Sequence, residues 1–201
     1  MATEAPVRPG RTERTPSSDL AMEVTAGSFD NRFTREFGLP SERVQQKVLS
    51  YLTDEVKAFI ARSPFLVMAT ADPDGRCDAS PKGGRPGFVR VLGDRHLLLP
   101  DVKGNRLFQS YLNLAANPHV GIVFFIPGVE RTVRVNGRVR IVDADEVRRL
   151  GAGLSVNDPD ENAVLLQGIV VEVEEAYGHC PRSLHFADVW NTATIERNRR
   201  G

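Results

Sequence analysis

The sequence predicts a mainly β protein, in which an antiparallel, closed or nearly closed barrel is flanked by helices. Short apolar or alternating runs follow one another with tight turns between them, such as the Asp-Pro-Asp-Gly turn at residues 72–75. Residues 132–142 alternate cleanly between apolar and polar side chains. Helical segments do not alternate regularly with the strands, as a parallel sheet would require.

The first expected elements are helices, and the strands follow them. Ser41 is positioned to cap a helix, and Thr53 to cap a second one that ends near Ser63 because proline follows. Further helices are expected at residues 107–116, 143–150 and 181–188. Strands are expected at residues 65–70, 76–81, 88–92, 96–100, 120–126, 132–142 and 169–174.

Composition sets the cellular context that we expect. The 201 residues carry 26 Lys and Arg against 26 Asp and Glu, so no overall field favours nucleic acid or an acidic membrane. Residues 1–27 are rich in Pro, Ser and Thr and predict a flexible tail, or an arm that becomes ordered only on a partner subunit, with residues 28–201 forming a single domain. No apolar run is long enough for a membrane span, and no export signal is evident, so we expect a cytoplasmic protein.

The turn at residues 101–106 is one candidate site. Gly104 frees the backbone, Asn105 is positioned to cap the next helix, and Lys103 and Arg106 bring two positive charges. The amino end of a helix attracts anions, and these cations would strengthen it for a phosphate. A solvated corner with two exposed basic residues is the plainer interpretation.

A second candidate is the polar, glycine-rich segment 78–84. Ser80 and Lys82 can donate hydrogen bonds to a flat ligand, and the glycines let the backbone approach it. An ordinary loop explains the segment equally well.

The strand expected at residues 132–142 gives a third candidate. Val133, Val135, Val139 and Ile141 share one face, whereas Arg134, Asn136 and Arg138 share the other. The basic face is either simply exposed or one wall of a cleft for an anionic ligand. No histidine or cysteine spacing predicts a metal site, and roles for His179, Cys180 and His185 stay open.

In order and spacing, these pieces resemble the pyridoxamine 5'-phosphate oxidase-like FMN-binding split barrels. The resemblance rests on FLVMATADPDGRCDASPKGG, PGFVRVL, LLLPDVKGNRLFQSYLNLAANPHVGIVFFIPG and RTVRVNGRVRI. It covers about residues 41–182 and is nearer to the poorly characterised bacterial FMN-dependent branch than to the vitamin-synthesising enzyme. It implies an antiparallel split β-barrel, a homodimer with the flavin at the subunit interface, FMN as cofactor and a small-molecule substrate.

The resemblance also implies roles for named residues. Lys103, Gly104, Asn105 and Arg106 would grip the FMN phosphate, and the strand from Leu99 to Asp101 would line the ribityl chain. Ser80, Pro81, Lys82 and Gly83 would run beside the isoalloxazine ring, and Arg131 and Arg134 would reach the flavin of the partner. No catalytic residue is assigned, because the flavin itself carries the hydride.

One departure from the family limits the substrate. The vitamin-synthesising enzymes carry an Arg-x-His signature near the C-terminus, whereas Arg182 and His185 stand one residue farther apart. The expected function is therefore that of an FMN-dependent oxidoreductase that passes electrons from a reduced donor to a small organic acceptor, and pyridoxamine phosphate is not expected to be its substrate. A deazaflavin-dependent reductase, or a non-catalytic flavin- or haem-binding protein, is the alternative.

Overall fold

The computed structural model describes residues 29–161 and 163–200, so the tail predicted at residues 1–27 lies outside the described residues. The chain divides into two compact units, residues 1–41 and 42–201. In the first unit, the described part contains α1 (Arg32–Phe37), which begins at a capping box formed by Asn31 and Thr34.

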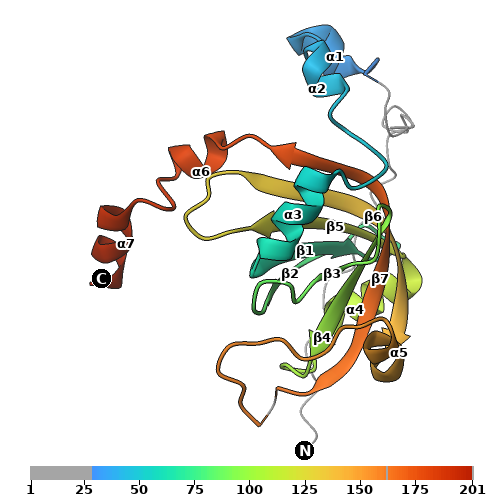
Figure 1. The fold of residues 1–201 in the computed structure, drawn as a ribbon. Coiled ribbons are helices and arrows are strands. Elements are labelled where there is room, and N and C mark those ends of the chain that lie inside the picture. Colours follow the sequence, from blue (N-terminus) through green and yellow to red (C-terminus); the bar gives the residue numbers. More distant parts are fainter. Residues whose placement is uncertain (1–28, 162, 201) are drawn as a thin grey trace, which may run out of the picture. The chain divides into compact units, whose positions relative to one another are not determined.

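The second unit is built on one seven-stranded antiparallel sheet with the order β2-β1-β5-β6-β7-β4-β3 (Figure 1). The sheet curls into a barrel whose edge strands are β2 and β3. This confirms the mainly β, antiparallel prediction. The strands are β1 (Phe65–Ala71), β2 (Cys77–Gly83), β3 (Arg90–Val91), β4 (His96–Val102), β5 (His119–Phe125), β6 (Thr132–Asp143) and β7 (Leu165–His179).

Flanking helices complete the core. In α3 (Asp54–Arg62), Val56, Phe59 and Ile60 are buried and the helix packs against β3, β6 and β7. Its amino end is capped by Thr53, as the sequence predicts. On another side, α4 (Gln109–Ala116) packs against β1, β2 and β6 and buries Leu114. Shorter helices are α2 (Glu42–Gln45), α5 (Ala144–Arg149), α6 (Arg182–Phe186) and α7 (Thr192–Arg199).

The alternation predicted along β6 holds as far as Val139, which is partly buried against the main core, and fails at Ile141. Val133 and Val135 are buried in the main core, but Ile141 is 38% exposed and Val142 is buried instead. The pairing with β7 shifts register between Asn136 and Gly137, and α5 covers the opposite face beyond that point. Val142 packs there with Leu98 and Val147 in a second small core, so placing Ile141 on the buried face was wrong.

Two strands extend beyond their predicted limits. β2 runs through Gly83, because β1 pairs with it as far as Phe65, and the glycines therefore do not break it where expected. β7 has 15 residues, because β6 pairs along most of its length. α7 was not predicted, although Asn191 caps it with a side-chain hydrogen bond to the amide of Thr194.

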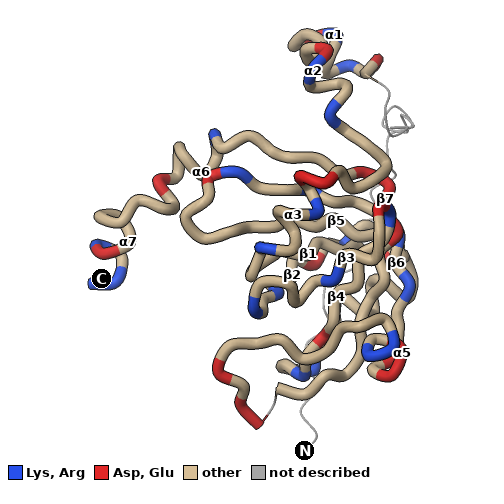
Figure 2. The backbone as a smooth tube through the Cα atoms, in the orientation of Figure 1, with Lys and Arg blue, Asp and Glu red and all other residues tan. Residues whose placement is uncertain are grey.

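In the described part of the chain, no helix is both long and apolar enough to cross a membrane. Basic and acidic residues are interspersed along the sheet and helices (Figure 2). Both cysteines, Cys77 and Cys180, are exposed and free.

Candidate cofactor-binding cleft

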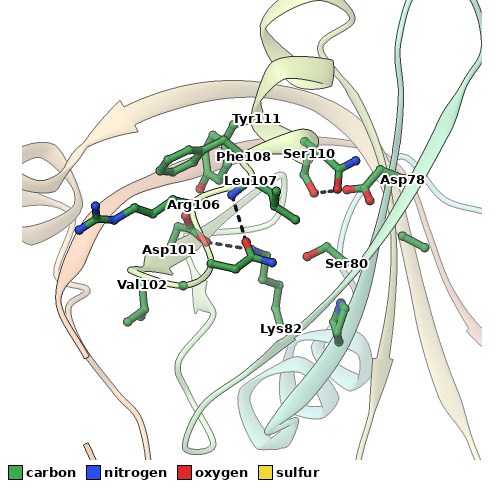
Figure 3. A pocket seen from close by; sticks show the side chains of 15 residues that line it. Asp78, Ser80, Lys82, Asp101, Val102, Arg106, Leu107, Phe108, Ser110 and Tyr111 are labelled. Carbon is green, nitrogen blue, oxygen red and sulfur yellow. Dashed lines mark hydrogen bonds and ion pairs between the residues drawn. The ribbon is translucent and has the colours of Figure 1, made fainter. Parts of the chain in front are cut away.

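A cleft of about 270 Å³ opens where β2, the end of β4, the following turn and the start of α4 meet (Figure 3). The β2 wall carries Asp78, Ser80 and Lys82, which alternate along the strand. Their β1 partners, Thr70, Met68 and Leu66, are all buried, so this row belongs to the inner face of the sheet.

Lys82 and Asp101 form an ion pair inside the cleft, with Nζ and Oδ1 2.9 Å apart. The Asp101 side chain is 10% exposed and that of Lys82 is 28% exposed. The predicted turn was expected to begin at Asp101, but β4 continues through Val102 and places this carboxylate in a strand. The lysine charge is thus already balanced within the chain.

The turn after β4 adopts an unusual backbone. Arg106 and Phe108 have φ angles of 61° and 52°, in the left-handed region that non-glycine residues seldom occupy. The Asn105 side chain accepts a hydrogen bond from the Leu107 amide at 3.1 Å and stabilises the turn. Strained backbone of this kind is often found where a ligand binds.

Asn105 does not cap the helix, so that expectation was wrong. The N-cap of α4 is Phe108, and no side chain caps it. The extra turn at residues 106–108 separates Asn105 from the helix. The first helical residues, Gln109 to Tyr111, line the cleft, so an uncapped helix amino end with its partial positive charge opens onto it.

Two residues of the first turn of α4 anchor the helix to the walls. The Ser110 hydroxyl donates to Asp78 Oδ2 at 2.5 Å, which ties α4 to β2. Burial raises the pKa of the Tyr111 phenol, and the negative charge of Asp101 raises it further. Tyr111 is therefore a neutral hydrogen-bonding group at physiological pH.

The structure brings many of the sequence-predicted residues to this cleft. Ser80, Pro81, Lys82, Asp101, Gly104, Asn105 and Arg106 line it. Arg106 extends outward from the turn, away from Ser80 (Figure 3). It forms no ion pair with any described residue.

The other predicted site residues do not line this cleft. Lys103 faces an adjoining hollow beside residues 156–160, and Leu99 is buried in the core below the cleft. Gly83 ends β2 on its exposed side. Arg131 pairs with Glu55, and Arg134 lies over the ring of Tyr177. Their predicted contact with the flavin of a second subunit stays a prediction.

Sequence reasoning placed Asp78 in the candidate segment 78–84 but gave it no role, and it did not identify Ser110 or Tyr111 as cleft residues. Asp78 precedes Ser80 by two residues, so strand alternation puts it in the same row. Ser110 and Tyr111 gave no such signal, since only the packing of α4 brings them to the cleft. No group of three His, Cys, Asp or Glu side chains suited to a metal exists among the residues that the structure describes.

Comparison with protein-family models shows to which family the chain belongs. The model of the pyridoxamine 5'-phosphate oxidase family matches residues 52–180, which contain β1 to β7, α3 and the whole cleft. The chain belongs to the pyridoxamine 5'-phosphate oxidase family. This confirms the resemblance read from the sequence.

Individual members of the family are moderately similar. A pyridoxine/pyridoxamine 5'-phosphate oxidase of Pseudomonas entomophila is 32% identical over 136 residues, covering 58% of this chain and 57% of its own. One of Pseudomonas putida is 32% identical over 151 residues, covering 65% of each chain. The chain thus spans about three fifths of the length of these curated relatives.

A solved structure from Lactobacillus delbrueckii, provisionally called a pyridoxamine 5'-phosphate oxidase, is 23% identical. The match has a TM-score of 0.47 and covers 66% of this chain and 99% of that one.

Proposed function

We propose that this protein binds FMN in the cleft between β2 and α4 and acts as an oxidoreductase on a small organic acceptor. Membership of an oxidoreductase family supports the reaction class. The observation that carries the proposal is the cleft itself, in which residues of the segments at 80–83 and 101–106, which the family resemblance assigns to the flavin, meet the start of α4.

The residues present suit the chemistry of FMN. A flavin offers ring carbonyl and nitrogen acceptors, and Ser80 and Lys82 present a hydroxyl and an ammonium in one row. Its phosphate needs positive potential, which the uncapped amino end of α4 and Arg106 would supply. The carboxylates of Asp78 and Asp101 are each held by a partner within the cleft, which reduces their repulsion of a phosphate.

The residues of the chain would bind and orient the cofactor. FMN, when bound, supplies the hydride-transfer chemistry. Lys82 would hold the ring edge while Asp101 fixes the direction of its side chain. Ser110 and Asp78 would keep the start of α4 against β2, so that the helix amides stay aimed at the phosphate.

We also propose that the protein works as a homodimer with the flavin at the subunit interface. The cleft, at about 270 Å³, is smaller than the range of about 300–1,000 Å³ that is usual for ligand sites, which suits a site completed by a second copy. Leu107 beside it is 61% exposed, which suits a rim covered by a second copy. A small molecule, and no nucleic acid, would be the substrate.

An absorbance spectrum of the purified protein, followed by mass analysis of the ligand released by heat, tests the cofactor. We expect flavin bands and about one FMN per chain. A deazaflavin or haem spectrum would replace the FMN assignment with one of those cofactors. Colourless protein that takes up no added FMN would contradict the proposal.

A further inference from the structure

A group of cationic side chains surrounds Tyr177 on the outer face of the sheet. Arg134 on β6 pairs directly with Tyr177 on β7, and its guanidinium carbon lies 5.6 Å from the ring centroid. The ammonium of Lys47 lies 5.2 Å from the same centroid. Since Val133 and Val135 are buried, Arg134 and Tyr177 occupy the opposite, outer face.

Within the described part of the chain, these two charges are not balanced by an ion pair. Neither Lys47 nor Arg134 forms an ion pair with a described residue, and Lys47 only donates a 3.4 Å hydrogen bond to the carbonyl of Gly178. The neighbouring carboxylate, Glu175, accepts a hydrogen bond from Asn136 at 2.8 Å. Lys47, Arg134 and Tyr177 are all half-buried, so water screens the two charges less than it screens fully exposed ones.

His179 joins this group from the end of β7. Its Nδ1 atom is buried and has no hydrogen-bond partner among the described residues. Burial lowers the pKa of the imidazole, and the charges of Arg134 and Lys47 lower it further. An unpaired buried polar atom is unfavourable, and an anion beside it would satisfy Nδ1 as a donor.

We propose that Lys47, Arg134 and His179 form an anion-binding site for the phosphate or carboxylate group of a small ligand, separate from the cleft at β2 and α4. An anion would neutralise the two unpaired cations and accept a hydrogen bond from the imidazole. Both cations make cation–π contacts with the ring of Tyr177, which holds them side by side. The site does not depend on FMN binding in the cleft.

The resemblance gives a different role to Arg134, which would reach the flavin of a second subunit. In both roles Arg134 would bind an anionic group. In one role that group belongs to a separate small ligand, and in the other it belongs to the FMN of the second subunit. Sulfate is a suitable probe for the free-ligand role, because its charge is constant over the range in which histidine titrates.

Proton NMR of the four histidines, with and without sulfate at constant ionic strength, tests the site. A bound anion favours the imidazolium, so sulfate should raise the pKa of His179, and a His179→Gln variant assigns the signal. Arg134→Ala and Lys47→Ala should each weaken sulfate binding about tenfold, as expected for one charge-assisted hydrogen bond. Arg138→Ala, which removes an exposed arginine from the same strand, should leave binding unchanged.

Absence of a His179 response, or an equal loss in Arg138→Ala, would overturn the site. The titration is then repeated with protein saturated with FMN. Sulfate binding that persists supports a separate site, whereas sulfate that displaces FMN would assign the cations to the flavin phosphate and overturn the proposal. If the protein takes up no FMN, the proposed function fails, but the sulfate titration still decides this site.

Discussion

Lys82 and Asp101 join two strands that are far apart in the order of the sheet. Lys82 lies on edge strand β2, and Asp101 lies on β4, which is next to the opposite edge strand, β3. Four strands, β1, β5, β6 and β7, separate β2 from β4 in the sheet order. Their 2.9 Å ion pair spans the seam of the barrel, where β2 approaches β4 without pairing to it, and both residues line the cleft. One contact therefore links barrel closure to the candidate site.

Replacing Lys82 with Met should lower the free energy of unfolding of the cofactor-free protein by about 2 kcal/mol, since it leaves the buried Asp101 charge without a partner. Chemical denaturation measures this change. In the double variant with Lys82→Met and Asp101→Asn, most of the lost free energy of unfolding should be recovered, because position 101 no longer carries a charge. As a control, Arg148→Met breaks an exposed ion pair with Asp145 and should change stability by less than about 0.5 kcal/mol. If Lys82→Met and Arg148→Met changed the free energy of unfolding equally, the ion pair of Lys82 with Asp101 would not stabilise the barrel as we expect.

The two basic residues of the turn should contribute unequally to FMN binding. Arg106 lines the cleft and forms no ion pair with another described residue, and its exposed side chain can turn toward a phosphate at little energetic cost. Lys103 faces the adjoining hollow. In fluorescence titrations with FMN, Arg106→Ala should raise the Kd about tenfold or more, whereas Lys103→Ala should change it less than threefold. If Lys103→Ala raised the Kd more than Arg106→Ala, the phosphate would instead bind in the hollow beside residues 156–160.

Gly137 should tolerate no side chain. A Cβ atom at this position would overlap the carbonyl oxygen of Glu172 on β7, at the place where the pairing of β6 and β7 shifts register. Gly137→Ala should therefore lower the free energy of unfolding by about 2–3 kcal/mol, measured by thermal or chemical denaturation. The matched variant is Gly178→Ala, since a Cβ there meets nothing within 4 Å. If both variants were equally stable, the described strand register would be wrong.

Tyr111 should stay protonated in alkaline solution until the protein unfolds. Burial, with the nearby charge of Asp101, raises the phenol pKa above its ordinary value of 10.0. Because the folded-state pKa is the higher one, the unfolded chain loses this proton first. Stability is therefore fully present below about pH 10 and falls as the pH rises toward the folded-state value.

Absorbance titration of the tyrosines checks this. The difference between the wild type and Tyr111→Phe should show no ionisation of Tyr111 before the unfolding transition. The stability advantage of the wild type over Tyr111→Phe should shrink above pH 10. Ionisation of Tyr111 in the folded protein near pH 10 would show that the phenol is accessible to water.

The sequence by itself determined the antiparallel class and most element positions, because these depend on neighbouring residues. The alternation of Val133 and Val135 with Arg134 marked a half-buried strand, and Thr53 marked the start of α3 through a local hydrogen bond. The glycine, asparagine and basic residues at 103–106 marked the turn that borders the cleft.

Only the tertiary structure decided which distant residues meet. The pairing of Lys82 with Asp101 depends on how far the sheet curls, and the contact of Ser110 with Asp78 depends on how α4 packs. Val142 replaced Ile141 in the buried set because α5 covers that face of β6. Burial at such positions depends on elements that are remote in the sequence, and local periodicity carries no information about their arrangement in space.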